Sequence, residues 1–513
     1  MRVIESAETL RFESADLDQF SLASGDRNPL HCDRDYARRT PYGEPVVFGM
    51  LGAIACLGTS RRGSDGRLKS IACHFRAPLY TGIDYRVELA SDADDAFEAR
   101  IVDGRRVVLD VKAAFEPRIA SRDSAPRGVG PRIPRTEARR LVMSELEPGA
   151  SVHGEYAPNW PEVRILGQRT GIDRGGLDVA DVGALLLLSY IVGMEIPGER
   201  ALFSTVDLHF DAGRPQGANE FGFEVEPVTV DARINRITAN VELTVEGSHF
   251  GAGELVAFVR DEVPPVDVSE LRGLLPGAPG LLGTNALVVG GSRGLGAAIV
   301  HALSLSGSDA VFAYERSREA AETVVRTAPG PGAVTAVRGD AADPEWCRTL
   351  AEDIVTRHGG LDVLVCNACP SFGPLDVHPT TVDRILDHVS RSVELTAVPI
   401  SASLDALALR GGTVAVISSS YAATPPAEWP HYVAGKRAIE GFVEVAARQR
   451  RDVAFLVVRP PKLVTDLTNT PLGRAGAIAP EVIAAAIAAR LADDRRPEEP
   501  VELMETFDCV PAR

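Results

Sequence analysis

Cysteine, positive charge and long apolar runs are all scarce in this sequence. Seven cysteines among 513 residues are too few, and odd in number, for a disulfide framework, which indicates a reducing compartment. The formal net charge is -17, so non-specific binding of nucleic acid is excluded. The longest apolar stretch, 184–192, contains Ser189 and falls well short of the roughly 20 residues of a membrane span. The N-terminus lacks an apolar signal core. We therefore expect a cytoplasmic protein that neither enters a membrane nor coats DNA.

The chain is long enough for about three domains, since one domain usually takes roughly 100–200 residues. Hydrophobic residues make up 45% and charged residues 24%, as in globular proteins. Two stretches rich in proline and glycine, 118–140 and 264–284, are predicted to be linkers. The first carries seven arginines against two carboxylates, a local net charge of +5. The expected domains are therefore 1–117, 141–263 and 285–513.

Two of these blocks share one order of elements, and the third differs. In the first two blocks a helical region precedes strands of alternating apolar and polar residues, such as 105–115 and 201–210. The apolar segment 179–194 is predicted to be the central helix of the second block. After residue 284, strands and helices alternate, which is typical of a parallel α/β sheet. The pattern predicts one fold used twice, followed by a different one.

A glycine-rich turn opens the third block. The buried-strand run 285–289 leads into Gly-Gly-Ser-Arg-Gly-Leu-Gly and then into a helix. Glycines in such a turn let backbone N–H groups approach a pyrophosphate at the helix N-terminus. The strand before the turn and the helix after it favour a dinucleotide site over an ordinary connection. The residues expected to contact the dinucleotide here are Gly290, Ser292, Arg293, Gly294, Leu295 and Gly296.

A tyrosine and a lysine lie four residues apart further along, in His-Tyr-Val-Ala-Gly-Lys. At this spacing Tyr432 and Lys436 share one face of a helix. An ammonium beside a phenol lowers the pKa of the phenol, so Tyr432 is expected to exchange a proton with an alcohol near neutral pH. The serines 418–420 follow a predicted strand, at the edge where an open sheet places its ligand.

These motifs resemble the short-chain dehydrogenase/reductase family over about residues 284–495. The resemblance implies that Tyr432 donates a proton to a carbonyl oxygen and that Ser419 hydrogen-bonds that oxygen. It implies that Lys436 holds the cofactor's ribose and tunes Tyr432. The remaining cofactor residues that it implies, near the adenine and in the wall of the site, are Asp340, Ala341 and Asn367.

The choice of cofactor is argued from the charges after the second predicted strand. Arg316 and Ser317, with Arg293 of the glycine turn, are suited to a 2′-phosphate, which favours NADPH over NADH. Glu315 opposes this choice, because a carboxylate there would bind a 2′-hydroxyl instead. No metal site is expected.

Three features depart from the family pattern. The family's helix asparagine, which helps to relay protons, falls at Val389, next to His388. Its Pro-Gly after the sixth strand is Pro460-Pro461, and its C-terminal glycine pair is absent. The first departure requires a water or a neighbour to replace the asparagine, and the second predicts a stiffer substrate loop. Cys366 and Cys369 form a C-x-x-C pattern in the cofactor wall, where packing is preferred to redox chemistry.

The N-terminal block carries an acid and a base in one loop. Asp26 and His31 lie five residues apart in a segment broken by Pro29, so their side chains can converge on one substrate atom. Such a pair can take a proton from carbon and protonate a departing hydroxyl. The predicted helix start near Gly49 offers backbone N–H groups to a thioester carbonyl as its charge develops. The alternative is an Asx-turn aspartate with a surface histidine.

The string Ser-Gly-Asp-x-Asn-Pro-x-His, followed by Gly-Met at a helix entry, resembles the MaoC-like (R)-specific enoyl hydratases and dehydratases. Their fold is the hotdog, a sheet wrapped around a long helix. The resemblance implies that Asp26 and His31 are the catalytic pair, that Asn28 orients them and that Gly49 lends an N–H group. Phe48 stands where the family usually has histidine, so we expect a changed pocket shape rather than lost activity.

The middle block has no second copy of this motif, and core or surface roles are expected for His153, His209 and His249. By the same resemblance it is a second, non-catalytic hotdog that builds part of an acyl tunnel. The expected fold is therefore an α+β double hotdog followed by an α/β Rossmann-like doubly wound parallel sheet.

Together the resemblances imply consecutive reactions. These are reduction of a 3-oxoacyl thioester with NADPH and dehydration of the 3-hydroxyacyl thioester to a trans-2-enoyl thioester, in fatty-acid- or polyketide-type biosynthesis. The carrier would be acyl carrier protein or coenzyme A, and the arginine-rich linker is a candidate landing site for an acidic carrier protein. Both resemblances imply a homodimer. The alternatives are hydration followed by oxidation in a catabolic chain, or a dehydratase with a non-catalytic reductase-like scaffold.

Overall fold

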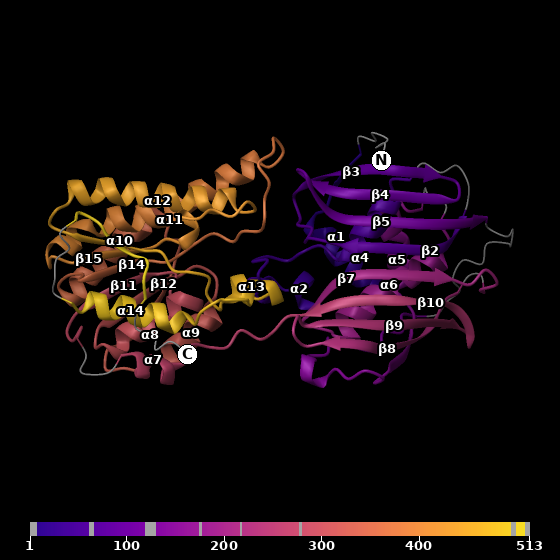
Figure 1. Ribbon diagram of the computed structural model, residues 1–513, viewed down its shortest axis with the longest axis horizontal. Helices are drawn as coiled ribbons and strands as arrows, with labels where there is room; N and C mark the ends of the chain where they lie inside the picture. Colours follow the sequence, from indigo (N-terminus) through magenta and orange to yellow (C-terminus); the bar gives the residue numbers. More distant parts are fainter. Residues whose placement is uncertain are drawn as a thin grey trace. The chain divides into compact units, whose positions relative to one another are not determined.

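The computed structural model describes residues 8–60, 66–117, 130–173, 177–215, 218–275, 280–493 and 499–507 (Figure 1). The chain forms two compact units. The first consists of Met1–Asp261 with Thr470–Leu472, and the second of Glu262–Asn469 with Gly473–Arg513. Within the described ranges, no helix is both long and apolar enough to cross a membrane.

The first unit is built on one antiparallel sheet of ten strands (Figure 1). The strands are β1 (Thr9–Arg11), β2 (Gly66–Phe75), β3 (Asp84–Ala93), β4 (Ala96–Asp103), β5 (Arg106–Pro117), β6 (Val152–Tyr156), β7 (Ala201–Phe210), β8 (Phe221–Asp231), β9 (Arg236–Val245) and β10 (Ser248–Val259). Their order is β1-β3-β4-β5-β2-β7-β10-β9-β8-β6. β2 and β7 join the two halves, with Ser70 opposite His209 and His74 opposite Thr205. The repeat in the sequence thus forms one continuous sheet.

Two apolar helices form the centre of this unit. Its helices are α1 (Ser14–Ser24), α2 (Pro29–Cys32), α3 (Arg34–Ala37), α4 (Gly49–Leu57), α5 (Trp160–Thr170) and α6 (Val179–Tyr190), with a π-helical turn over Ile191–Glu195 and a 3₁₀ turn over Met143–Glu145. α4 and α6 are apolar on nearly every face and share one core with the sheet, so they are the central helices of the two halves. The predicted double hotdog is confirmed.

The second unit is built on a parallel sheet of seven strands in the order β13-β12-β11-β14-β15-β16-β17. The strands are β11 (Asn285–Val289), β12 (Asp309–Tyr314), β13 (Val334–Arg338), β14 (Val363–Cys366), β15 (Thr413–Ile417), β16 (Ala454–Val458) and β17 (Glu502–Met504). The order reverses between β11 and β14, which is the point where a doubly wound sheet binds its ligand. The predicted Rossmann-like fold is confirmed.

Helices cover both faces of this sheet (Figure 1). The helices after residue 262 are α7 (Val268–Leu274), α8 (Gly294–Leu305), α9 (Arg318–Arg326), α10 (Pro344–His358), α11 (Val382–Ala408), α12 (Pro430–Gln449), α13 (Pro471–Arg474) and α14 (Pro480–Leu491), with 3₁₀ turns over Ser420–Ala422 and Asp466–Thr468. Of these, α13 contributes none of its described side chains to the two cores of the sheet. α8, α9 and α14 bury one face, and α10, α11 and α12 bury the other, each with its own apolar core.

The predicted linker 264–284 contains helix α7. Asp267 caps its N-terminus by accepting hydrogen bonds from the N–H groups of Ser269 (2.8 Å) and Glu270 (3.1 Å). Leu271 is fully buried in the core of the second unit. An aspartate cap followed by Glu270 in the first turn is a helix start signal, and here it outweighs the surrounding prolines and glycines.

The predicted arginine-rich linker is described only from residue 130, because 118–129 lie outside the described residues. The described part is tied to the first unit by ion pairs. Arg132 pairs with Glu220 at 2.5 Å, and Arg140 pairs with Glu199 at 2.6 Å. Arg135 and Arg139 both pair with the buried Glu195. Four of the seven arginines therefore have carboxylate partners within the chain, which weakens the case for this stretch as a carrier-protein landing site.

Candidate active sites

A cavity of about 270 Å³ opens in the first unit, and every predicted residue of the N-terminal site lines it. Asp26, Asn28, His31 and Gly49 come from the first half. The second half adds lining residues from the end of α6, from the π-helical turn after it and from two of its strands: Ser189, Val192, Gly193, Ala201, Leu202, Phe203, Ser204 and Phe258. The expectation that the second half helps to build the pocket agrees with this lining.

Asn28 fixes the loop between α1 and α2. Its side-chain N–H groups donate to the carbonyl oxygens of Gly193 (3.0 Å) and Gly198 (2.9 Å). Its Oδ1 accepts from the N–H of Leu30 at 3.0 Å. The side chain is buried and uses both its donor and its acceptor group on backbone atoms. Asn28 therefore holds the loop against the second half, which is a positioning role.

Asp26 is buried against the end of the second central helix. Its Oδ2 accepts a hydrogen bond from the Ser189 hydroxyl at 2.8 Å, and its Oδ1 accepts from the N–H of Asn28 at 3.0 Å. Burial raises the pKa of Asp26 to about 7, although these two hydrogen bonds oppose the shift. A Cβ at Gly193 would collide with both carboxylate oxygens, so this position requires glycine. Reasoning from the sequence missed Ser189 and Gly193.

His31 faces the same cavity as a neutral imidazole. Its Nδ1 donates to the carbonyl oxygen of Val46 at 2.7 Å, which leaves Nε2 as the unprotonated nitrogen. Burial lowers the pKa of His31 to about 4, the hydrogen bond to Val46 opposes this shift, and the positive charge of Arg260 adds to it. The ring stacks on Phe48 with centroids 4.0 Å apart. Phe48, the expected departure from the family pattern, therefore supports the imidazole.

Gly49 begins α4 at the cavity wall. The first N–H groups of a helix have no partner within the helix, so they can face a ligand. A Cβ at Gly49 would lie 2.8 Å from Cδ1 of Phe75, which is too close for any larger residue. Phe75 lines the cavity and contacts Phe203 across it with ring centroids 4.8 Å apart. Because residue 49 is glycine, the N-terminus of α4 can pack directly against the ring of Phe75.

The second half repeats the loop that carries Asp26 but lacks the carboxylate. α1 ends at Gly25 with φ +70°, and α5 ends at Gly171 with φ +74°. Asp26 follows the first of these glycines, whereas the buried Ile172 follows the second. An apolar side chain therefore stands where the first half has its candidate acid.

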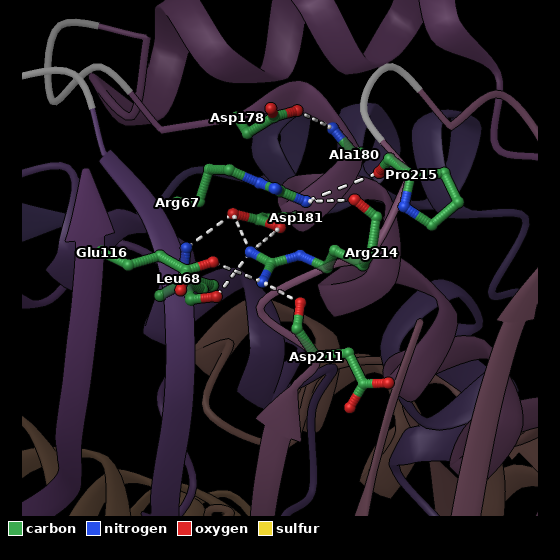
Figure 2. Close-up of polar contacts among 9 residues, drawn as sticks. All are labelled: Arg67, Leu68, Glu116, Asp178, Ala180, Asp181, Asp211, Arg214 and Pro215. Carbon is green, nitrogen blue, oxygen red and sulfur yellow. Dashed lines mark hydrogen bonds and ion pairs between the residues drawn. The ribbon is translucent and has the colours of Figure 1, made fainter. Parts of the chain in front are cut away.

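Arg214, in the loop after β7, reaches the first turn of α6 in the second half (Figure 2). Its side chain is fully buried, donates to the Leu68 carbonyl oxygen and pairs with Asp181 at 3.0 Å. Its guanidinium also lies 4.8 Å from the ring centre of Phe210, at the end of β7. Burial raises the pKa of Asp181 to about 6, and the charge of Arg214 opposes that shift. A buried ion pair thus links the start of the second central helix to the loop after β7.

Asp181→Asn is expected to destabilise the first unit by about 1–3 kcal/mol, because it leaves the buried Arg214 with the partly exposed Glu116, at 3.1 Å, as its remaining charged partner. Replacing both residues, as in Asp181→Leu with Arg214→Met, is expected to restore most of this loss. Calorimetry of the full chain measures the change as a lower unfolding temperature of one transition. Arg233→Met, which breaks an exposed pair with Asp231, is the matched control and is expected to cost about 0–1 kcal/mol. Equal shifts for the two single variants would contradict the assignment.

In the second unit the glycine turn lies between β11 and α8, at the reversal of the strand order. Gly290 has φ +82°, and a Cβ there would lie 2.9 Å from the Cα of Ala368. Asn367 donates from Nδ2 to the carbonyl oxygen of Gly290 at 2.8 Å, and a Cβ at Gly296 would lie 2.6 Å from that Nδ2. This close backbone cradle, followed by a helix N-terminus, fits a dinucleotide pyrophosphate.

Ser419, Tyr432 and Lys436 come together at the end of β15. Lys436 donates from Nζ to the carbonyl oxygen of Ile417 at 2.8 Å, and this ammonium lies 5.6 Å from the ring centre of Tyr432. Burial raises the pKa of Tyr432, and a side-chain hydrogen bond with Ser419 only partly opposes it. The sequence predicted that Lys436 would lower the pKa of Tyr432. This prediction is wrong, because burial away from water disfavours the charged phenolate more strongly. Tyr432 is a protonated donor at neutral pH.

The charged residues predicted for the adenosine end have partners in the chain. Arg316 pairs with Glu315 at 2.7 Å. Asp340 pairs with Arg391 of α11 at 2.7 Å, a residue that reasoning from the sequence missed. Arg293 of the glycine turn pairs with Asp466 at 3.3 Å.

The other predicted cofactor residues lie in the turn or close to it. Ser292 belongs to the turn and Gly294 begins α8. Leu295 and Ala341 are buried, and Ser317 immediately precedes α9.

Two family models match the chain. The model of the MaoC like domain matches residues 2–112, and the model of the short chain dehydrogenase matches residues 284–472. The first matched segment contains Asp26, Asn28, His31 and Gly49 of the cavity, and the second contains the glycine turn.

Curated relatives match the second unit. The cyclic-di-GMP-binding biofilm dispersal mediator protein of Escherichia coli (strain K12) is 35% identical over 191 residues, which cover 36% of this chain and 75% of that protein. Versicolorin reductase 1 of Aspergillus parasiticus is 35% identical over 192 residues, covering 36% and 71%. The 3-oxoacyl-[acyl-carrier-protein] reductase FabG of Staphylococcus aureus (strain Mu50) is 28% identical over 198 residues, covering 36% and 76%. The chain therefore belongs to the short-chain dehydrogenase family through its second unit, and it carries a MaoC-like domain in its first.

Proposed function

We propose that this chain reduces a 3-oxoacyl thioester with NADPH and dehydrates the resulting 3-hydroxyacyl thioester to a trans-2-enoyl thioester. The observation that carries the proposal is the presence of two complete sets of reacting groups in one chain. The first set is Asp26 with His31, and the second is Ser419, Tyr432 and Lys436. One chain keeps the intermediate at a high local concentration for the second reaction.

In the dehydration, His31 is the base and Asp26 is the acid. The unprotonated Nε2 of His31 takes a proton from C2 of the substrate. Asp26, whose pKa is raised to about 7 so that about half of it is protonated at pH 7, gives its proton to the departing hydroxyl, which leaves as water. The N-terminus of α4 at Gly49 stabilises the charge that develops on the thioester oxygen.

In the reduction, Tyr432 gives its phenolic proton to the carbonyl oxygen, and Ser419 hydrogen-bonds the same oxygen. Lys436 holds the ribose. The chemistry that a nicotinamide cofactor supplies here is hydride transfer to C3. The residues that would hold the dinucleotide are those of the glycine cradle together with Asn367 and Asp340. NADPH is favoured because Arg293, Arg316 and Arg391, each of which pairs with a carboxylate in this structure, are guanidinium groups that can also bind a 2′-phosphate.

One observation favours the opposite direction, hydration followed by oxidation. Glu315 already pairs with Arg316, so the carboxylate competes with a 2′-phosphate for that guanidinium. A carboxylate at this position suits the 2′-hydroxyl of NAD, the usual cofactor of oxidation. Relative kcat/KM values for NADPH and NADH decide between the two directions.

Mass spectrometry of products from a panel of 3-oxoacyl thioesters tests the proposal. Wild-type chain with NADPH is expected to convert them to 2-enoyl thioesters, with coenzyme A and acyl carrier protein compared as carriers. If no thioester is reduced and no nicotinamide binds, while a 3-hydroxyacyl thioester is still dehydrated, the second unit is a scaffold instead. The implied homodimer stays a prediction, which sedimentation of the same sample tests.

Dehydration is expected to have a bell-shaped pH profile. The rate falls below pH about 4, where His31 becomes protonated, and above pH about 7, where Asp26 loses the proton that it must donate. The measurement is kcat/KM for a 3-hydroxyacyl thioester from pH 3.5 to 9, roughly the span that brackets both groups. A rate that continues to rise above pH 7 would contradict these roles and make Asp26 the base.

A further inference from the structure

Two arginines at the edge of the cavity in the first unit share a single carboxylate. One oxygen of Asp110, on β5, accepts a hydrogen bond from Nε of Arg76, and the other accepts from Nε of Arg100, on β4, at 2.9 Å. Within the described ranges of the chain, neither arginine pairs with a second carboxylate. We call Arg76 and Arg100 the arginine pair. It keeps one positive charge that no carboxylate of the described chain neutralises.

The cavity wall includes the first of these arginines. The segment 75–79, which begins at the last residue of β2, lines the cavity together with Val108 and Leu109 of β5. The N–H of Arg76 donates to the carbonyl oxygen of Val108 at 2.8 Å, which fixes the backbone at this point. The Arg76 side chain is 55% exposed. Arg76 therefore belongs both to the cavity wall and to the surface that faces solvent.

The geometry of the arginine pair suits a phosphate. Both side chains bond to Asp110 through Nε, and among the residues that the structure describes their terminal nitrogens have no hydrogen-bond partner. The terminal N–H groups of a guanidinium form a planar fork that matches two oxygens of a phosphate. Asp110, whose side chain is only 13% exposed, holds both guanidinium groups, so an anion that binds them orders little further side chain.

The arginines of the linker 118–140 offer no equivalent site at this cavity. Every arginine in its described part pairs with a glutamate, and none of these residues lines the cavity. Attraction between exposed charges is largely screened beyond roughly 10 Å at 0.1 M salt, so a charge that guides a substrate into the cavity must lie close to it. The arginine pair meets this condition through Arg76.

We propose that the arginine pair binds the phosphate of the pantetheine arm that carries the acyl thioester into this cavity. The proposal rests on the proposed dehydratase function and assigns the residues that recognise the carrier. Coenzyme A and acyl carrier protein both hold the thioester on a pantetheine arm with this phosphate, so one site serves either carrier. The arm is long, so its phosphate can stay at the solvent-facing guanidinium groups while the thioester enters the cavity that Asp26 and His31 line.

The kinetic test uses the full chain and one 3-hydroxyacyl group on three carriers. These are coenzyme A, acyl carrier protein and pantetheine, which lacks the phosphate. Arg76→Gln is expected to raise the KM for dehydration of the first two thioesters by on the order of tenfold, with kcat unchanged. The KM for the pantetheine thioester is expected to stay at the wild-type value. Arg100→Gln is expected to give the same pattern with a smaller rise, because Arg100 does not line the cavity.

Arg86→Gln is the matched control. The Arg86 side chain is 54% exposed on β3 and pairs with Glu88 at 2.6 Å, but it does not line the cavity. All three KM values of this variant are expected to equal those of the wild-type chain. An equal rise for the pantetheine thioester in Arg76→Gln, or no rise for any thioester, would overturn the proposal. A rise with one carrier alone would place the contact outside the shared arm and would overturn it too.

A binding measurement separates this proposal from the proposed function. Calorimetric titration of the full chain is expected to show tighter binding of phosphopantetheine than of pantetheine, and Arg76→Gln is expected to remove most of this difference. If the wild-type chain dehydrates no thioester but the difference is present and depends on Arg76, the proposed function fails while the phosphate site stands. If the two compounds bind equally, the phosphate site fails, whatever the chain dehydrates.

Discussion

Asp26→Asn is expected to lower the dehydration rate by about 10²–10⁴-fold while NADPH-dependent reduction stays unchanged. The amide is nearly the same shape as the carboxylic acid, and it can keep the hydrogen bonds with Ser189 and the N–H of Asn28 because the serine hydroxyl can rotate. It cannot give up a proton at neutral pH. The variant therefore separates proton donation from the packing of the loop.

The measurement is the release of 2-enoyl thioester from a 3-hydroxyacyl thioester, followed beside NADPH oxidation with a 3-oxoacyl thioester. Asp18→Asn is the matched control, because Asp18 is exposed on α1, the helix that immediately precedes the loop of Asp26. Loss of both activities in Asp26→Asn would contradict independent sites. Unchanged dehydration would remove Asp26 from the reaction and return it to the role of a turn residue.

Ser189→Ala is expected to lower the dehydration rate less than Asp26→Asn does. The Ser189 hydroxyl donates to Asp26 and so favours its ionised form, and without it the acid would hold its proton more tightly. The residue acts through Asp26 and touches no reacting atom by itself. The pocket is therefore completed by a side chain that lies 163 positions further along the chain.

The elements that repeat a local pattern were predictable from the sequence, and the contacts between distant segments were not. The strand 285–289 and the helix start at Gly49 agree with β11 and α4, because apolar runs and glycine turns act over a few residues. Ser189 stood out only as a polar interruption of an apolar helix. Its partner became visible when the structure brought α6 against the loop of Asp26.

The second half illustrates the same limit. The missing motif predicted a non-catalytic hotdog, but nothing local to Arg214 indicated that its side chain would be buried against Asp181 of α6. Ion pairing with Asp181 depends on the pairing of β2 with β7, which sets Leu68 beside both residues. Such a contact follows from the register of two strands far apart in sequence, and the register was not available from either strand alone.

The wrong prediction of a lowered pKa for Tyr432 has a similar origin. The spacing of Tyr432 and Lys436 on one helix face was predictable and holds, whereas the pKa depends on how much water reaches the phenol. Phe372, from the loop after β14, stacks directly on the phenol ring. Burial as a whole, to which Phe372 contributes from sixty positions away, decided the sign of the pKa shift, and pairwise reasoning from Lys436 did not include it.

Tyr432→Phe is expected to lower reduction of a 3-oxoacyl thioester by about 10²–10⁴-fold while leaving dehydration and nicotinamide binding intact. Phenylalanine keeps the stacking on Phe372 but removes the phenolic hydroxyl that bonds to Ser419 and donates the proton. NADPH oxidation measures the loss, and equilibrium titration of NADPH measures binding. Dehydration by the same sample is an internal control for folding of the rest of the chain.

The serine next to this tyrosine makes the test specific to one position. Ser419→Ala is expected to slow reduction, whereas Ser420→Ala, one residue further into the 3₁₀ turn, is expected to leave it unchanged. If Tyr432→Phe retains full reduction, the proton comes from elsewhere and the proposed reductase mechanism fails. If wild-type chain binds NADPH but reduces nothing, the second unit is a cofactor-binding module without this activity.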